Sequence, residues 1–302
     1  MPEYILAADV GGTKIAAAAV SRSGRITHRC EVKTAKDGGR AVVDQLIALL
    51  HRLPQRNVRA IGVDVPGLAY QDGSVWAPNI RGWKRMPLGR LLRKHFGVPV
   101  TIESDRNAFV VGEAWRGAAR GCRNAIFLVV GTGIGAGILA DGRLVRGQGE
   151  LAGSVGWMAI RDEFLAPYAS IGCLESLAAG PGIGIAASRR LRRTVTCQEV
   201  AQLARRGDET ARAVLREAGC SLGLALANLV SIFNPAVILI GGGVAEAGSF
   251  MLRPAVQVMK KWTQPIALRQ VRILPSRLGD SAGLLGAAKL ALDGAKKQRK
   301  LS

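Results

Sequence analysis

The sequence predicts an α/β protein built from two lobes. Its 302 residues are enough for two domains of ordinary size. An apolar segment interrupted by a glycine turn occupies residues 5–20, and a similar segment recurs at residues 126–140. Each is typical of strand, turn and strand followed by a second tight turn, which predicts an antiparallel meander at the start of each lobe. Helical and strand-like segments alternate after the first meander, as expected of an α/β lobe.

The other elements follow from hydrophobic periodicity and from residues that end helices. In the second half, apolar residues at spacings of three and four mark one face of a long helix that ends before Asn234-Pro235. The further expected helices lie at 40–53, 87–96, about 246–261 and 280–292, with a helical run up to residue 115, and the further expected strands lie at 58–65, 98–103, 236–240 and 271–274.

Composition and charge indicate a folded protein with anionic partners. Hydrophobic residues make up 48% of the chain and charged residues 21%, so the chain can bury a core. A formal charge of +20 and a pI near 10.8 favour nucleotides, phosphates, nucleic acids or membrane surfaces, and charge alone does not choose among them. The basic runs at 189–193 and 296–300 are more typical of solvated surface than of a nucleic-acid contact.

The cysteines and the apolar segments indicate a cytoplasmic protein. The five cysteines are odd in number and form no C-x-x-C pair, which argues against a disulfide framework or an evident metal site. The apolar N-terminal segment contains Glu3 and Asp9 and follows no basic region, so it does not resemble a signal peptide. Glycines interrupt the longest apolar stretch, at 125–140, which falls short of the roughly 18 residues that span a membrane.

The segment Asp9–Lys14 has the residues of a phosphate-binding turn. Its two glycines allow a tight turn between strands and bring backbone N–H groups close to an anion. Asp9 can hold Mg²⁺ through water, because that ion takes few carboxylates and keeps several waters. The segment is not a Walker A loop, since the residues that follow it continue as a strand. An ordinary hairpin is the alternative.

Two further glycine segments lie in the second half. Gly131–Gly137 is followed by a strand rather than a helix, which contradicts a dinucleotide fingerprint and favours a second phosphate-facing hairpin with a hydroxyl from Thr132. Gly241-Gly242-Gly243 lies between a strand and a helix and would let an adenosine approach the backbone. Glycine-rich loops at such places are common, so this segment alone is weak evidence.

Asp105 follows a predicted strand and precedes a helical run. A carboxylate in this place can accept the proton of a substrate hydroxyl. A plain helix N-cap is the alternative, and for an isolated Asp it is the more common one. The two phosphate turns favour the catalytic interpretation.

Together these segments resemble the ROK family of sugar kinases and repressors, which has the actin-like ATPase and hexokinase architecture. The matching motifs are Asp9–Ile15, Gly62–Gly67, Ala77–Trp83, Ser104–Ala108, Gly112-Glu113, Gly131–Gly135, Ala152–Gly156, Gly172–Glu175 and Gly241–Val244. The resemblance implies two RNase H-like lobes, 1–116 with 281–302 and 117–280, with ATP and sugar in the cleft between them. Family members commonly form dimers, so a homodimer is expected.

The resemblance also implies roles for individual residues. Asp105 matches the catalytic base, which takes the proton of a sugar hydroxyl as it attacks the γ-phosphate of ATP. The phosphate and nucleotide positions are Asp9, Gly11, Gly12, Thr13, Lys14, Gly131, Thr132, Gly133, Gly242 and Gly243. The sugar positions are Asn79, Ser104, Asp105, Ser154, Trp157 and Glu175. ATP and Mg²⁺ are the implied cofactors, and the implied activity is glucokinase-like phosphorylation of a hexose-like sugar at its C6 hydroxyl.

Three sugar positions depart from the family pattern. Ser104 replaces an Asn, while Ser154 and Trp157 replace a Glu and a His that reach toward C1 and C2 of the hexose. Their loss favours a substrate substituted at C1 or C2, with Trp157 either stacked on a ring or buried in the core. A non-catalytic sugar-binding regulator is the other alternative. Since only eight residues precede Asp9, no DNA-binding domain and no specific nucleic-acid partner are expected.

The family's zinc-binding pattern is also altered. Of its cysteines only Cys173 remains, and one thiol cannot make a four-ligand site. We therefore expect no structural zinc, with Trp157 and Tyr168 packed where the metal would lie.

Overall fold

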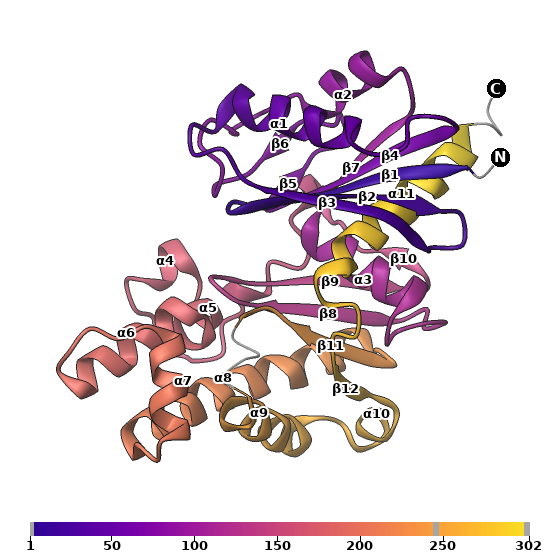
Figure 1. The fold of residues 1–302 in the computed structure, drawn as a ribbon. Helices are drawn as coiled ribbons and strands as arrows, with labels where there is room; N and C mark the ends of the chain where they lie inside the picture. The colour runs from indigo at the N-terminus through magenta and orange to yellow at the C-terminus, as the bar shows by residue number, and fades with distance from the viewer. Residues whose placement is uncertain (1–2, 244–247, 299–302) are drawn as a thin grey trace. The chain divides into compact units, whose positions relative to one another are not determined.

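The computed structural model describes residues 3–243 and 248–298. They form two compact units, each an α/β structure as predicted (Figure 1). Val244, the start expected for the helix at 246, and Arg299 and Lys300 of the basic tail lie outside the described residues.

The two units have discontinuous sequences. The first contains the chain up to Gly121, residues 146–152 and the chain from Arg277 onward, and the second contains 122–145 and 153–276. Relative to the expected lobes, residues 117–121, 146–152 and 277–280 therefore lie with the first unit.

The first unit is organised around a five-stranded sheet with the order β3-β2-β1-β4-β7. Its strands are β1 (Tyr4–Val10), β2 (Lys14–Ser21), β3 (Ile26–Lys33), β4 (Val58–Val65) and β7 (Val100–Ser104). β1, β2 and β3 form the predicted antiparallel meander, while β1, β4 and β7 run parallel. A separate pair, β5 (Leu68–Ala69) and β6 (Val75–Trp76), is antiparallel.

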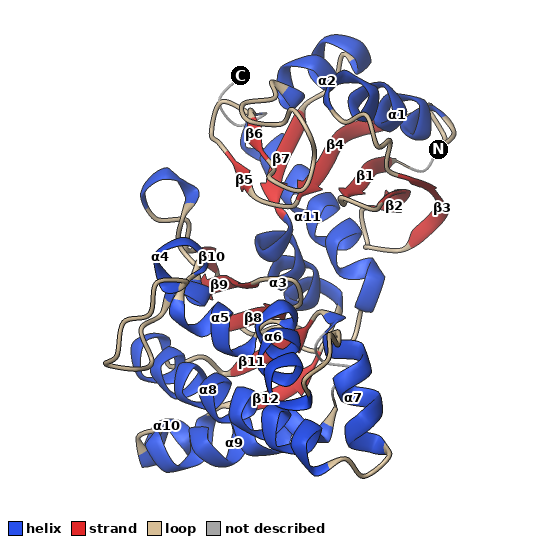
Figure 2. Ribbon diagram, turned by 90° about the vertical axis from the view of Figure 1, so that its left-hand side faces the viewer, coloured by secondary structure: helices blue, strands red, loops and turns tan. Residues whose placement is uncertain are grey.

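Both faces of this sheet are covered, which explains why β1 is apolar up to Asp9. Leu6 and Ala8 point into one core and Ile5 and Ala7 into the other, since side chains alternate along a strand. Helices α1 (Gly39–His51) and α2 (Leu88–Phe96) cover the first face, and α11 (Ala282–Gln298) covers the second, with α3 (Asp105–Arg116) packed against it (Figure 2).

The second unit repeats this plan, with the strand order β10-β9-β8-β11-β12. Its strands are β8 (Ala125–Val130), β9 (Ile134–Ala140), β10 (Arg143–Leu144), β11 (Val237–Gly241) and β12 (Arg272–Pro275). Its helices are α4 (Tyr168–Ile171), α5 (Cys173–Ala178), α6 (Gly180–Leu191), α7 (Cys197–Arg205), α8 (Glu209–Phe233), α9 (Ser249–Trp262) and α10 (Pro265–Gln270). The antiparallel start of this unit, β8 and β9, is also as predicted.

Helix α8 is the central helix of the second unit. Its apolar face, which includes Leu215 and Leu222, packs into the same core as Ile126 and Leu128 of β8. Within the described residues, it alone is long and apolar enough to cross a membrane, yet 67% of its most apolar stretch is buried in the unit. This burial is what a core helix requires.

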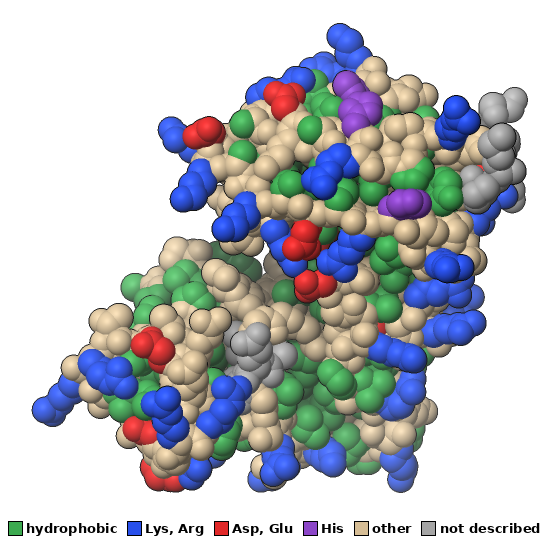
Figure 3. Space-filling view, in the orientation of Figure 1, with side chains coloured by type: hydrophobic (Ala, Val, Ile, Leu, Met, Phe, Trp, Pro, Cys, Tyr) green, Lys and Arg blue, Asp and Glu red, His purple; other side chains and the backbone are tan. Residues whose placement is uncertain are grey.

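Lys and Arg side chains are spread over much of the face seen in Figure 3, and Asp and Glu side chains are few there. This face therefore reflects the excess of Lys and Arg over Asp and Glu in the sequence.

Candidate active site

Carboxylates gather in the first unit where its parallel strands end. Asp9 of β1 lies opposite Asp64 of β4, and Asp64 lies opposite Glu103 of β7. Asp105 follows directly as the first residue of α3. Ligands of open α/β sheets bind outside the carboxyl ends of parallel strands. This edge is therefore the candidate site of the first unit.

Asp105 has the properties of a general base. Its carboxylate Oδ1 accepts a hydrogen bond from the N–H of Arg106 at 2.6 Å. Burial raises the pKa of the Asp105 carboxyl from 3.8 to about 6; the Arg106 hydrogen bond opposes this rise, and the charge of Asp9 adds to it. A carboxylate with a pKa close to neutral is suited to accept a proton from a hydroxyl at physiological pH.

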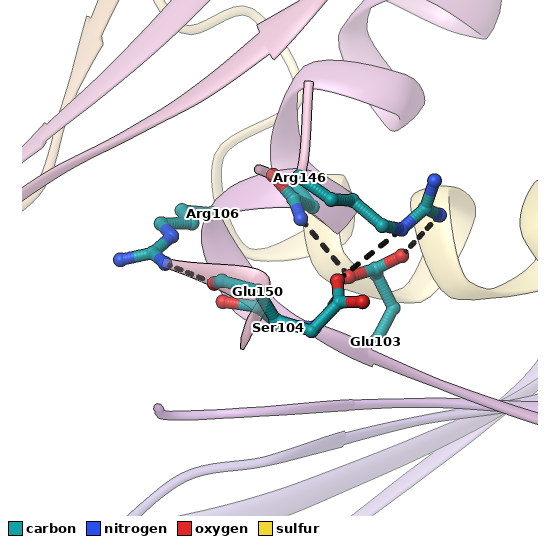
Figure 4. Close-up of polar contacts among 6 residues, drawn as sticks. Glu103, Ser104, Arg106, Arg146 and Glu150 are labelled. Atoms are coloured by element: carbon teal, nitrogen blue, oxygen red, sulfur yellow. Dashed lines mark hydrogen bonds and ion pairs between the residues drawn. The ribbon is translucent and has the colours of Figure 1, made fainter. Parts of the chain in front are cut away.

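Glu103, two residues before Asp105, is held by a network of charges (Figure 4). Arg146 donates from Nη2 to Glu103 Oε2 at 2.6 Å, and its Nε lies 3.5 Å from a carboxylate oxygen of Glu150. Arg106 donates from Nη2 to the carbonyl oxygen of Glu150 at 3.1 Å. The network fixes the end of β7, from which Asp105 begins α3.

The first phosphate turn is a tight hairpin between β1 and β2. Its Gly11 N–H donates to the carbonyl of Lys14 at 2.9 Å, and Lys14 Nζ donates to Asp280 at 2.7 Å. A Cβ atom on Gly12 would lie 3.2 Å from the Cβ of Asn79. The structure thus brings the predicted sugar-loop residue Asn79 against the predicted phosphate turn.

The second phosphate turn, between β8 and β9, is closed by a hydrogen bond from Gly131 N–H to the carbonyl of Gly133 at 2.9 Å. Glu175 of α5 accepts a hydrogen bond at Oε2 from the Ile134 N–H at 2.7 Å. The same oxygen lies 3.0 Å from where a Cβ of Gly133 would be. In the second unit too, a predicted sugar-binding residue, Glu175, therefore contacts a predicted phosphate turn.

A cavity of about 770 Å³ adjoins this turn. It is lined by Gly131, Thr132 and Gly243, by Gly184, Ile185, Ser188 and Arg189 of α6, and by residues 194–198. Gly242, next to this wall, has a φ of 98°, and a Cβ there would lie 2.4 Å from the carbonyl oxygen of Val130, so only glycine fits. The volume suits a ligand of nucleotide size.

Trp157 is not buried. Its side chain is 55% exposed, so both its packing at the place of a zinc ion and its burial in the core were wrong predictions. Trp157 lies in the short turn Val155–Trp157. The preceding residue, Gly156, packs directly against Glu175, since a Cβ atom on Gly156 would lie only 2.7 Å from Glu175 Oε2. The residue before the exposed Trp157 thus packs against Glu175, a predicted sugar-site residue.

Tyr168, by contrast, is buried beside Cys173. Both side chains are less than a tenth exposed. Burial raises the pKa of the Tyr168 hydroxyl, and the nearby Cys173 thiol adds to the rise. Among the residues that the structure describes, no three His, Cys, Asp or Glu side chains are grouped as a metal site, and the expectation of no zinc stays a prediction.

The predicted site residues divide between the units. The first unit holds Asp9, Gly11, Gly12, Thr13, Lys14, Asn79, Ser104 and Asp105, and the second holds Gly131, Thr132, Gly133, Ser154, Trp157, Glu175, Gly242 and Gly243. Ser104 is buried and its hydroxyl lies 3.5 Å from Asp105 Oδ1.

Sequence reasoning missed Asp64 and the Glu103–Arg146 pair. Asp64 could have been noticed in the sequence, because it is the one acid in the apolar part of its strand, as Asp9 is in β1. Arg146 could not, since it is distant in sequence from Glu103.

Comparison with known proteins identifies the family. The pattern of the ROK family matches residues 5–294. The chain belongs to the ROK family. A glucokinase of Halalkalibacterium halodurans is 31% identical over 95% of this chain and 94% of its own. The ROK hexokinase of Thermus thermophilus has a similar structure, with a TM-score of 0.86, 33% identity and coverage of 97% of this chain and 99% of its own.

A third relative was solved with ligands. The ROK glucokinase of Streptomyces griseus, in complex with glucose and AMPPNP, has a TM-score of 0.78 and 31% identity, covering 96% of this chain and all of its own. These ROK structures share the actin-like ATPase architecture, and the two five-stranded sheets of this chain are its RNase H-like lobes.

Proposed function

We propose that this chain is an ATP-dependent kinase that phosphorylates a hexose-like sugar at its C6 hydroxyl. The observation that carries the proposal is Asp105, a carboxylate at a strand end with its pKa raised to about 6. Both phosphate turns and the 770 Å³ cavity support it, because a kinase needs groups for a nucleotide as well as a base. The sugar kinases among its relatives support it further.

In this mechanism Asp105 accepts the proton of the sugar hydroxyl. The hydroxyl oxygen forms a bond to the γ-phosphorus of ATP, and the bond from that phosphorus to the bridging oxygen breaks as ADP leaves. A base of this kind contributes about 10²–10⁴-fold. The backbone N–H groups of the glycine turns position the phosphates, and positioning carries much of phosphoryl transfer.

The first unit has donors suited to Mg²⁺. Asp9 lies one residue before the end of β1, and Asp64 beside it has two buried carboxylate oxygens to which no side-chain N–H or hydroxyl group of the described residues donates. Mg²⁺ prefers such hard oxygen ligands. When bound, the ion would neutralise charge on the transferring phosphoryl group.

The kinase is tested by ADP release from ATP and Mg²⁺ over free hexoses, amino sugars and β-glucosides. Turnover should vanish in D105N and persist in D44N, whose aspartate is exposed and paired with Arg40. Glucose should turn over while 6-deoxyglucose, which lacks the acceptor hydroxyl, should not. Absence of turnover with any sugar, with sugar binding intact, would instead establish a sugar-binding regulator.

The exposed Trp157 favours a sugar that is substituted at C1 or C2. A ring 55% exposed beside the Glu175 segment is available to stack on an aglycone. The W157A variant should raise KM for a β-glucoside and leave KM for glucose unchanged. W262A, which removes another exposed tryptophan of the same unit, is the control. Equal constants for glucose and all substituted sugars in the wild type would contradict this specificity.

The homodimer, the cytoplasmic location and the lack of a nucleic-acid partner remain part of this proposal. Sedimentation at several concentrations tests the dimer.

A further inference from the structure

The carboxyl group of Asp64 is an unusual feature of the first unit. The residue is fully buried near the end of β4. Within residues 3–243 and 248–298, no side chain other than the carboxyl group of Asp9 lies in hydrogen-bonding contact with its carboxylate oxygens. An ionised carboxylate without a partner is costly to bury, because water no longer solvates it. A proton or a cation must therefore balance its charge.

The surroundings of Asp64 indicate where that balancing charge would lie. Asp9 is its direct neighbour across the parallel pairing of β1 and β4. Side chains of paired residues lie on the same face of a sheet, so the two carboxyl groups are adjacent.

Gly283, in the first turn of α11, completes this space. A Cβ at Gly283 would lie 2.9 Å from Asp64 Oδ2 and 3.1 Å from Asp9 Oδ2, with Phe109 Cε1 at 3.0 Å. One oxygen of each carboxylate therefore faces the same point, and the missing side chain of Gly283 leaves that point free of carbon. The edge of the Phe109 ring borders one side of this space.

We propose that Asp64 acts with Asp9 as a second carboxylate for the divalent cation of this enzyme, in the space that Gly283 leaves open. Mg²⁺ is commonly held by one or two carboxylates and completes its shell with water and substrate phosphate. A cation there offsets the burial of Asp64, to which no Lys or Arg of the described residues donates a hydrogen bond. The ion belongs to the proposed kinase reaction, but its binding to the two carboxylates does not require nucleotide or sugar.

The test is binding of Mn²⁺ to the full chain without nucleotide and sugar, measured from the electron paramagnetic resonance signal of free Mn²⁺. Wild type should bind Mn²⁺, and Mg²⁺ should displace it. D64N keeps the shape of the side chain and should raise the Kd at least about tenfold, since it removes one of two charged ligands. D44N, an exposed aspartate outside this space, should leave the Kd unchanged.

G283A gives an independent measurement that keeps both carboxylates. Its methyl group would occupy the shared space and should also weaken Mn²⁺ binding about tenfold. Circular dichroism shows which variants fold, and either folded variant decides the question. Unchanged Mn²⁺ affinity in a folded D64N or G283A protein, or no binding by wild type, would overturn the proposal and assign a shared proton to the two aspartates.

Parallel ADP-release assays separate this inference from the kinase proposal. If wild type phosphorylates a sugar and D64N binds Mn²⁺ as tightly as wild type does, only the role of Asp64 is contradicted. Loss of Mn²⁺ binding in D64N, with a wild type that phosphorylates no sugar, would contradict only the kinase.

Discussion

The raised pKa of Asp105 predicts that removal of its charge stabilises the protein while it abolishes turnover. Burial raises this pKa from 3.8 to about 6, so the folded state favours the protonated carboxyl and is destabilised when the group ionises. At about 1.36 kcal/mol per pKa unit, the full cost is about 3 kcal/mol. The D105N variant keeps an oxygen that can accept the Arg106 N–H bond.

The gain in stability expected of D105N grows with pH. The ordinary pKa of 3.8 lies below the folded value of about 6, so the destabilisation is absent at low pH and grows as the pH rises through this range. D105N should therefore exceed wild type in unfolding free energy by about 3 kcal/mol at pH 7.5 and by about half of that at pH 5.

Urea unfolding at both pH values, followed by circular dichroism, measures this difference. D72N is the matched control, because hydrogen bonds from Ser74 and Arg85 lower the pKa of Asp72 to about 2 and so favour its charge. It should give no gain at pH 7.5. A D105N protein that is no more stable than wild type at pH 7.5, or equally stabilised at pH 5, would refute the assignment of a partly buried base that is destabilised by its charge.

Four other outcomes are expected. The pH profile of kcat/KM should fall on the acid side with an apparent pKa near 6, because Asp105 must be ionised, and a fall only near pH 4 would count against it as the base. R146A should lose roughly 1–3 kcal/mol in urea unfolding, since it removes the ion-pair partner of the buried Glu103 carboxylate, whose Oε1 keeps hydrogen bonds from Ser104 N–H and Asn107; an unchanged midpoint would show that the pair contributes little. I185D should raise KM for ATP at least about tenfold by placing a negative charge in the cavity wall, with KM for the sugar as the control. Incubation with a zinc chelator should leave Tm unchanged, as Cys173 is the one remaining cysteine of the zinc pattern, and a fall in Tm would reveal bound zinc.

The strands and helices were predictable where a run of neighbouring residues shows a clear hydrophobic pattern and an evident end. The strand at Val58–Val65 has the predicted bounds, and the long helix ends at Phe233, before Asn234-Pro235, because Asn234 adopts a left-handed conformation there. By contrast, no element was predicted for α4 and α5. These helices have 4 and 6 residues, which is too short for a period of 3.6 residues to be recognised.

The site was predictable to the extent that its residues form local motifs. The glycine turns and Asp105 follow strands directly, so their order along the chain shows their place at the edge of a sheet. The partners that hold them come from distant segments: Arg146 for Glu103, and Gly283 for Asp64. Such pairings depend on the packing of the whole unit, and no local pattern in the sequence contains them.

The altered zinc pattern and the exposed Trp157 are best explained by two separate changes. Tyr168 and Cys173 are buried together, and the ring of Phe164 meets Tyr168 edge to face at 6.2 Å between centroids. Apolar burial of a tyrosine can hold a short segment such as α4 without a metal. The side chain of Trp157, in contrast, is more than half exposed to solvent. The exposure of its ring leaves Trp157 available for the substrate contact proposed above, which W157A tests.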